Sequence, residues 1–237
     1  KVRILGRFAE EPRANARRNH GEVHVTEQVV GFKKIKFHTN ENVGAGDLTM
    51  PENEMHTTSY WLTVPREIMR ALPFTLEERR DGVVALSYTL GQLAALFLMC
   101  DRHDLGVALG DNGQGEARVE RGLLRAGYVP RSGDPRSGLS QGGPGGAGVP
   151  PQLHKGGEFT SPPCEEPNVF VYDAYPGGMG LSEPLFRLHD RLLAESRTLI
   201  AACGCRDGCP SCVGPVGEVG SRGKQVALVL LDVILDG

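Results

Sequence analysis

Four of the six cysteines of this chain fall within ten residues near the C-terminus. They are Cys203, Cys205, Cys209 and Cys212. Four thiolates so close together can bind one metal ion, and Zn²⁺ takes four such ligands in a tetrahedral structural site. The intervening Gly204, Gly208 and Pro210 supply the backbone freedom and the fixed turn that the chain needs to curl around an ion. The spacing therefore predicts a zinc site.

Other interpretations of the same cysteines remain open. An iron–sulfur cluster also takes four thiolate ligands. A redox Cys-x-x-Cys pair would use Cys209 and Cys212 and leave the other two cysteines unexplained. Two local disulfides would be strained at these spacings and would need an oxidising compartment, of which the sequence gives no sign. Zinc is favoured, and because a closed four-cysteine site leaves no position for water or substrate, the expected role of the ion is structural.

A glycine-rich loop, Pro176–Gly180, is the second candidate site. It lies between a predicted strand over 168–173 and a predicted helix over 183–202. Free backbone N–H groups at such a junction can bind phosphate, so Gly177 and Gly178 are candidate contacts to DNA. A tight turn with positive φ explains the same glycines and is favoured, since the loop lacks a lysine. Asp173 is expected to cap or brace the loop.

A basic stretch opens the chain. Between Lys1 and His38, nine Lys or Arg residues stand against four Glu, a local charge of +5, whereas the whole chain carries −3. The overall balance excludes binding to nucleic acid through total charge alone. Lys33, Lys34 and Lys36 are candidate contacts to DNA phosphates, although a solvated face would also account for them.

One histidine invites a metal or acid–base interpretation. His103 lies between Asp101 and Asp104, after a strongly apolar segment. Such residues more often cap a helix end, which is the expectation here.

The elements that must position these residues predict an α+β fold: a small antiparallel sheet with packed helices and a C-terminal four-cysteine zinc knot. Besides the strand over 168–173, β-branched and alternating segments predict strands over 22–31, 32–39 and 58–64, with a loop over 40–53. Besides the helix over 183–202, periodicity predicts helices over 66–72, 82–102 and 224–236. The helix over 82–102 is apolar on so many sides that it should lie at the centre of the core.

We expect one zinc-binding domain over residues 1–237. Its parts are a β-rich region (1–65), a helical core (66–108), a flexible insertion (109–163), and a region with the strand, glycine loop, helix, cysteines and terminal helix (164–237). The insertion is predicted because residues 132–163 contain nine Gly and six Pro. A segment of this composition can bury too little apolar surface to offset the loss of conformational entropy on folding.

The sequence also predicts where the chain resides. The longest apolar run, Val226–Leu235, is too short to cross a bilayer, and no positively charged region precedes an apolar stretch as in a signal peptide. A cytoplasmic protein without a membrane partner is expected. The first residue is Lys rather than Met, so the chain is expected to be a piece of a longer one.

The motifs, taken in order, resemble a known family. The run Phe170–Glu183, with its Pro-Gly-Gly loop, is followed by a helix and then by the Cys-x-Cys and Cys-Pro-Ser-Cys-Val motifs. Three further motifs precede this run in the sequence: Val30–Lys36, Thr57–Leu62 and Asp101–Gly106. This pattern resembles the C-terminal zinc-binding domain of bacterial DNA helicases of the mitomycin repair factor A type, the YprA-like members of superfamily 2. The resemblance covers nearly the whole chain except the insertion.

The resemblance implies a structural zinc module attached to two RecA-like motor domains of the same chain, in an ATP-dependent DNA helicase that acts in DNA repair. ATP would bind only in those motor domains, because this chain has no G-x-x-x-x-G-K-[ST] phosphate loop and is not expected to be an enzyme by itself. DNA and the motor domains are then the partners. The alternative is a zinc module that recruits a protein partner without a direct role in unwinding. A free-standing hydrolase or oxidoreductase is disfavoured, since no open metal site or nucleophile–base pair is found.

Overall fold

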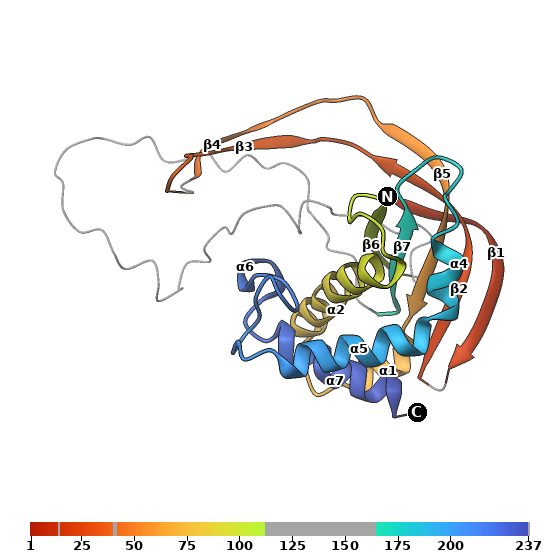
Figure 1. Cartoon of the computed structure of the whole chain (residues 1–237). Coiled ribbons are helices and arrows are strands. Elements are labelled where there is room, and N and C mark those ends of the chain that lie inside the picture. Colours follow the sequence, from red (N-terminus) through yellow and green to blue (C-terminus); the bar gives the residue numbers. More distant parts are fainter. Residues whose placement is uncertain (14, 40–41, 112–164, 237) are drawn as a thin grey trace.

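The computed structural model describes residues 1–13, 15–39, 42–111 and 165–236. The expected insertion (109–163) lies almost wholly outside the described residues. The fold is α+β, as predicted: an antiparallel sheet with helices packed against one face (Figure 1). The sheet holds five strands in the order β1-β2-β5-β7-β6, and β3 and β4 form a separate two-stranded ribbon.

The strands of the large sheet are β1 (Val2–Arg13), β2 (Ala16–Glu27), β5 (Asn53–Thr63), β6 (Leu105–Asp111) and β7 (Pro167–Asp173). The ribbon consists of β3 (Gly31–Ile35) and β4 (Asn42–Asp47). The helices are α1 (Arg66–Ala71), α2 (Leu76–Leu98), α4 (Ser182–Arg187), α5 (His189–Ala202), α6 (Val216–Val219) and α7 (Gly223–Leu235).

Strand β5 is the centre of the sheet, and its alternation builds two cores. Tyr60, paired with His20 on β2 and Val171 on β7, faces the helices. Trp61, paired with Phe170, belongs to a smaller apolar cluster on the opposite face. Because successive side chains of a strand point to opposite faces, one strand contributes to both cores.

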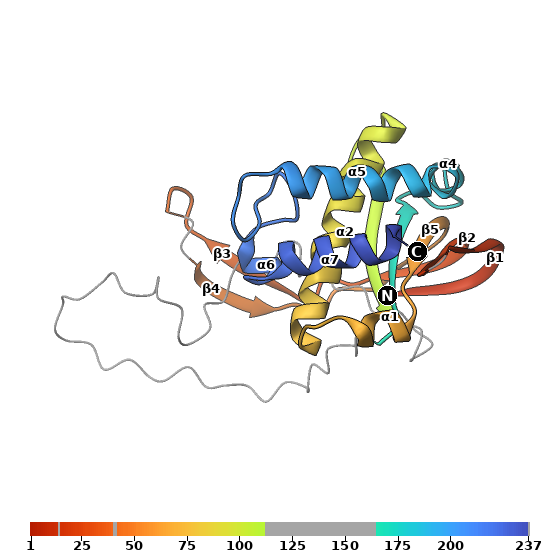
Figure 2. The same ribbon diagram turned by 90° about the horizontal axis from the view of Figure 1, so that it is seen from below.

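Helix α2 is the central helix, as its apolar composition predicts. A capping box of Thr75 and Glu78 fixes its start, and it ends at Met99 in a left-handed conformation, φ 51°. It packs against the sheet and crosses α7 closely (Figure 2). At the crossing, a Cβ on Gly82 would lie 2.4 Å from the Val226 side chain, so only glycine fits. Among the described residues, α2 is the one helix long and apolar enough to cross a membrane, and 61% of its apolar window is buried inside the protein, as in a core helix.

Several element predictions were wrong. Strands β1 and β6 were not foreseen, and β6 begins within the segment expected to be helical. β1 is an edge strand whose many charged residues mask its alternation. The predicted loop over 40–53 contains β4, whose Gly-Ala-Gly centre has low strand propensity and is held by pairing with β3. The helix expected over 183–202 is interrupted at Leu188, between α4 and α5.

Candidate metal centre

The four cysteines predicted as ligands come together at the end of α5. Their sulfur atoms all lie within 4.8 Å of one another. The Sγ–Sγ distances are 3.5 Å for Cys203–Cys205, 3.6 Å for Cys203–Cys209, 3.5 Å for Cys205–Cys212 and 3.7 Å for Cys209–Cys212. Within the described part of the chain, this is the one group of His, Cys, Asp and Glu side chains close enough to hold a metal ion.

These distances fit a single tetrahedral ion. Zn–S bonds of about 2.3 Å give a tetrahedron with sulfur–sulfur edges of roughly 3.8 Å. A disulfide would need sulfurs about 2.0 Å apart, so the four thiols are unpaired. In a two-iron cluster the thiolates bind the two iron atoms in pairs, and in a four-iron cluster each thiolate binds its own iron, so sulfurs on different iron atoms lie further apart than sulfurs around one ion. The donor set and its size therefore fit Zn²⁺.

The cysteine loop (residues 203–215) folds tightly to deliver these ligands. The backbone N–H groups of Cys212 and Gly214 both donate to the carbonyl of Cys209, each at 3.0 Å. Gly208 and Gly214 have φ of 134° and 97°, which favour glycine. The prediction that glycines allow the chain to curl is confirmed at Gly208.

Side chains of α2 hold the cysteine loop against the core. Tyr88 and Gln92 donate hydrogen bonds to the carbonyl of Pro210 at 2.9 and 3.1 Å. Thr89 donates to the carbonyl of Cys212 at 3.1 Å, and Cys212 is fully buried. An ion held here would join the end of α5 and the segment before α7 to the central helix.

A lysine that sequence reasoning missed completes the centre. Lys224, in the first turn of α7, is 9% exposed. Its ammonium donates to the carbonyls of Cys203 and Cys205, each at 2.6 Å, and lies 3.5 Å from the Cys205 sulfur. A zinc ion with four thiolates carries a net charge of about −2, and this ammonium partly offsets it. Nothing in the local sequence places Lys224 beside cysteines some twenty residues earlier.

Two thiols of the centre titrate differently. The backbone N–H of Ser211 and the neighbouring Cys203 thiol lower the pKa of Cys209 to about 7. Burial raises the pKa of Cys212 to about 12. Cys212 is therefore a neutral thiol near neutral pH in the absence of a cation, and binding of an ion there must release its proton.

The glycine loop between β7 and α4 is a tight turn braced by Asp173. The Asp173 carboxylate accepts hydrogen bonds from the backbone N–H groups of Met179 and Leu181 at 2.6 and 3.1 Å, as expected of a bracing residue. Gly177 and Gly178 have φ of 84° and 76°, and their N–H groups donate to protein carbonyls. These contacts favour the turn, and contact of Gly177 and Gly178 with DNA stays a prediction.

The other predicted residues lie apart from the cysteines. Lys33 and Lys34 are on β3 and Lys36 follows it, all three on the exposed ribbon. Asp101 accepts hydrogen bonds from the backbone N–H and the ring of His103 at 2.8 and 2.6 Å. His103 therefore belongs to a turn over residues 101–104 that follows α2, whereas the end of α2 itself is capped at Met99 and not by His103 as expected.

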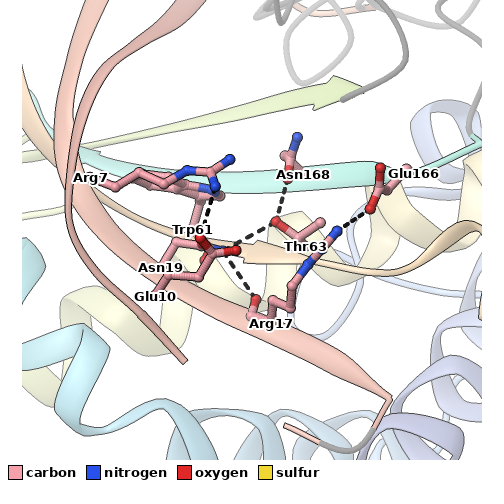
Figure 3. A network of polar contacts seen from close by, with 8 residues as sticks. All are labelled: Arg7, Glu10, Arg17, Asn19, Trp61, Thr63, Glu166 and Asn168. Carbon is pink, nitrogen blue, oxygen red and sulfur yellow. Dashed lines mark hydrogen bonds and ion pairs between the residues drawn. The ribbon is translucent and has the colours of Figure 1, made fainter. Parts of the chain in front are cut away.

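A buried network of polar side chains crosses the sheet on the face opposite the helices (Figure 3). Asn19 donates to the hydroxyl of Thr63 at 3.2 Å, and Thr63 donates to the side-chain oxygen of Asn168 at 2.5 Å. Nearby, Arg17 forms an ion pair with Glu166. Since buried polar groups are costly unless they are paired, these hydrogen bonds between side chains fix the register of β2, β5 and β7. No local sequence signal identifies this network.

The geometry is that of a structural zinc-binding domain: an α+β domain in which four cysteine thiols are grouped as they are around a single metal ion. Comparison with known proteins agrees. Residues 154–213, which include all four cysteines, match the family described as the MrfA Zn-binding domain. The ATP-dependent helicase YprA of Bacillus subtilis (strain 168) is 30% identical over 98% of this chain and 24% of its own length. A protein of Methanocaldococcus jannaschii is 42% identical over 45 residues, which are 19% of this chain and 40% of that protein.

A solved structure matches as well. The crystal structure of the DUF1998 helicase MrfA bound to DNA is 27% identical and superposes with a TM-score of 0.59 over 98% of this chain and 24% of that one. The chain thus spans about a quarter of the length of the helicases it matches. It is homologous to YprA and MrfA over nearly all its residues, and residues 154–213 in its C-terminal region match the model of the MrfA Zn-binding domain.

Proposed function

We propose that this chain is a structural zinc-binding accessory domain of an ATP-dependent DNA helicase that acts in DNA repair. Cys203, Cys205, Cys209 and Cys212 hold Zn²⁺ in this proposal. The observation that carries it is the thiol quartet, in which four of the six Sγ–Sγ distances are 3.5–3.7 Å and all the sulfurs lie within 4.8 Å of one another, as around one tetrahedral ion.

The contribution of this chain is mechanical. A bound zinc ion supplies a closed tetrahedral cross-link. Tyr88, Thr89 and Gln92 join the cysteine loop to α2, and Lys224 joins it to α7. Binding free energies of structural zinc in small modules are on the order of 10 kcal/mol and act as folding free energy. With an ion held by the four cysteines, these contacts of the cysteine loop would keep α5 and α7 packed on α2.

The helicase part of the proposal is supported by the relatives. YprA and MrfA are named as helicases, and the MrfA structure that superposes with a TM-score of 0.59 contains DNA. In this proposal ATP hydrolysis belongs to separate motor domains of the helicase. The present domain supports the binding of DNA or the packing of those motor domains.

The zinc part is tested by removing one ligand. Cys209→Ser should lower the zinc content of the purified chain well below one equivalent and lower its melting temperature by loosening the α5–α7 region. Cys100→Ser is the matched control, because Cys100 lies outside the quartet, and it should keep its zinc. Metal analysis and thermal melting with and without a chelator measure both effects. Iron with sulfide in place of zinc, or equal melting after chelation, would overturn the zinc assignment.

A further inference from the structure

The β3–β4 ribbon and its flanks, residues 28–39 and 42–50, form an arm that leaves the sheet where β2 ends and β5 begins. The N–H of Leu48 donates to the carbonyl of Val30 at 2.9 Å, and the Gln28 side chain donates to the carbonyl of Met50 at 3.0 Å, so the ribbon continues from the sheet as a hairpin. The arm extends past the helices in Figure 1 and lies at the edge of the molecule in Figure 2.

The arm exposes aromatic and aliphatic side chains. Every residue from 31 to 39 is exposed, and Phe37, Ile35 and Phe32 are 88%, 53% and 42% exposed. In the described part of the chain, the two strands of the arm pair only with each other. Grouped exposed apolar side chains of this kind mark a surface that meets another molecule.

Small residues on β4 leave room for the aromatic ring of Phe32 on β3. Phe32 pairs with Gly46 and Lys34 pairs with Gly44. A Cβ on Gly46 would lie 2.8 Å from the Phe32 ring, so the ring lies directly over the glycine backbone. The Lys34 ammonium lies 5.8 Å from the centre of the same ring. One face of the ribbon thus presents an aromatic ring with a lysine ammonium over it.

The charge of this strand is of one sign. Between Gln28 and Asn40 the sequence contains three lysines and no acidic residue. Rings flank the lysines: Phe32 precedes Lys33 and Lys34, and Phe37 and His38 follow Lys36. At the tip, the rings of Phe37 and His38 lie 5.0 Å apart, edge to face.

We propose that the arm binds single-stranded DNA, with Phe32 and Phe37 stacking on bases and the lysines contacting phosphates. The inference rests on the proposed role in a DNA helicase, and it adds that the DNA bound by the arm is single-stranded and names the residues that bind it. Rings next to cations suit single strands, whose base faces are accessible, since in a duplex those faces are stacked inside. A protein partner for this strand would need to combine an apolar patch with acidic groups, whereas a single strand offers base faces and phosphates at every nucleotide.

The test uses the zinc-loaded chain and a fluorescently labelled oligothymidylate. The double variant Phe32→Ala with Phe37→Ala should bind about fivefold to a hundredfold more weakly for each ring that stacks. The double variant Lys34→Gln with Lys36→Gln should lower the slope of log affinity against log salt by about 0.7 for each lost phosphate contact. Phe8→Ala and Arg206→Gln remove an exposed ring and an exposed cation elsewhere and should bind as the wild type does.

The outcomes separate the arm from the proposed function. Zinc content and melting temperature should be unchanged in every variant, because the arm packs on itself. Absence of oligothymidylate binding by the zinc-loaded wild-type chain overturns the arm proposal while the zinc assignment stands. Equal affinity of wild type and both arm variants also overturns it and assigns the apolar side chains to a protein partner. Tighter binding to a duplex, unaffected by loss of the rings, overturns the stacking.

Discussion

Replacing Lys224 by Met tests whether a buried ammonium supports the metal centre. Met keeps most of the length and apolar volume of the side chain and removes the charge and its hydrogen bonds. The wild-type ammonium makes two bonds of 2.6 Å to the carbonyls of Cys203 and Cys205. Hydrogen bonds to charged groups contribute about 1.5–3 kcal/mol each, so the loss should be at least about 3 kcal/mol in the free energy of unfolding.

The same substitution should weaken zinc binding. The ammonium lies 3.5 Å from the Cys205 sulfur, and its charge stabilises the zinc-bound thiolates more than the neutral thiols. Loss of such supporting contacts typically costs about tenfold to a hundredfold in metal affinity. Competition with a colorimetric zinc chelator, at fixed pH and ionic strength, measures the affinity directly.

Arg206→Met is the matched control for this experiment. Arg206 lies on the same cysteine loop and carries the same charge, but its side chain is 93% exposed and pairs with Asp207. Its removal should leave zinc affinity unchanged, because water and salt screen exposed charges. If Lys224→Met and Arg206→Met retain zinc equally well, the ammonium has no specific role and the reasoning from its contacts is refuted.

Two further predictions concern stability. Burial lowers the pKa of His189 from 6.5 to about 4, and its ring accepts a hydrogen bond from Tyr60, so protonation favours the unfolded chain. The free energy of unfolding should therefore fall by about 3 kcal/mol in full as the pH drops from 6.5 towards 4. His189→Gln should flatten this dependence on pH, whereas His103→Gln should leave it unchanged. An equal slope in all three proteins would contradict the assignment. Gly178→Ala should destabilise by about 2–3 kcal/mol, because φ is 76° and the new Cβ would lie 2.5 Å from a threonine hydroxyl. Gly177→Ala, with φ of 84° and open space, should cost only the backbone part, about 1 kcal/mol; equal denaturant midpoints for the two variants would show that the clash is relieved.

The sequence alone predicted that the four cysteines form one cluster, because all four lie within ten consecutive residues. A short loop with glycines at the turns can bring Cys203 and Cys212 together whatever the rest of the chain does. The same local logic identified the central helix and the turn at the Pro-Gly-Gly loop, since apolar periodicity and the backbone freedom of glycine are properties of neighbouring residues.

Only the tertiary structure decided what surrounds that centre. Lys224 reaches the cysteines because α7 packs beside α5, and Thr89 reaches Cys212 across 123 positions. The edge strand β1 and the glycine-rich strand β4 exist through pairing with partners, which their own composition does not specify. The position of the Phe32 ring on the arm depends on that same pairing, because a Cβ on its neighbour Gly46 would lie 2.8 Å from the ring. Contacts between distant segments are set by packing of the whole chain, and no short pattern encodes them.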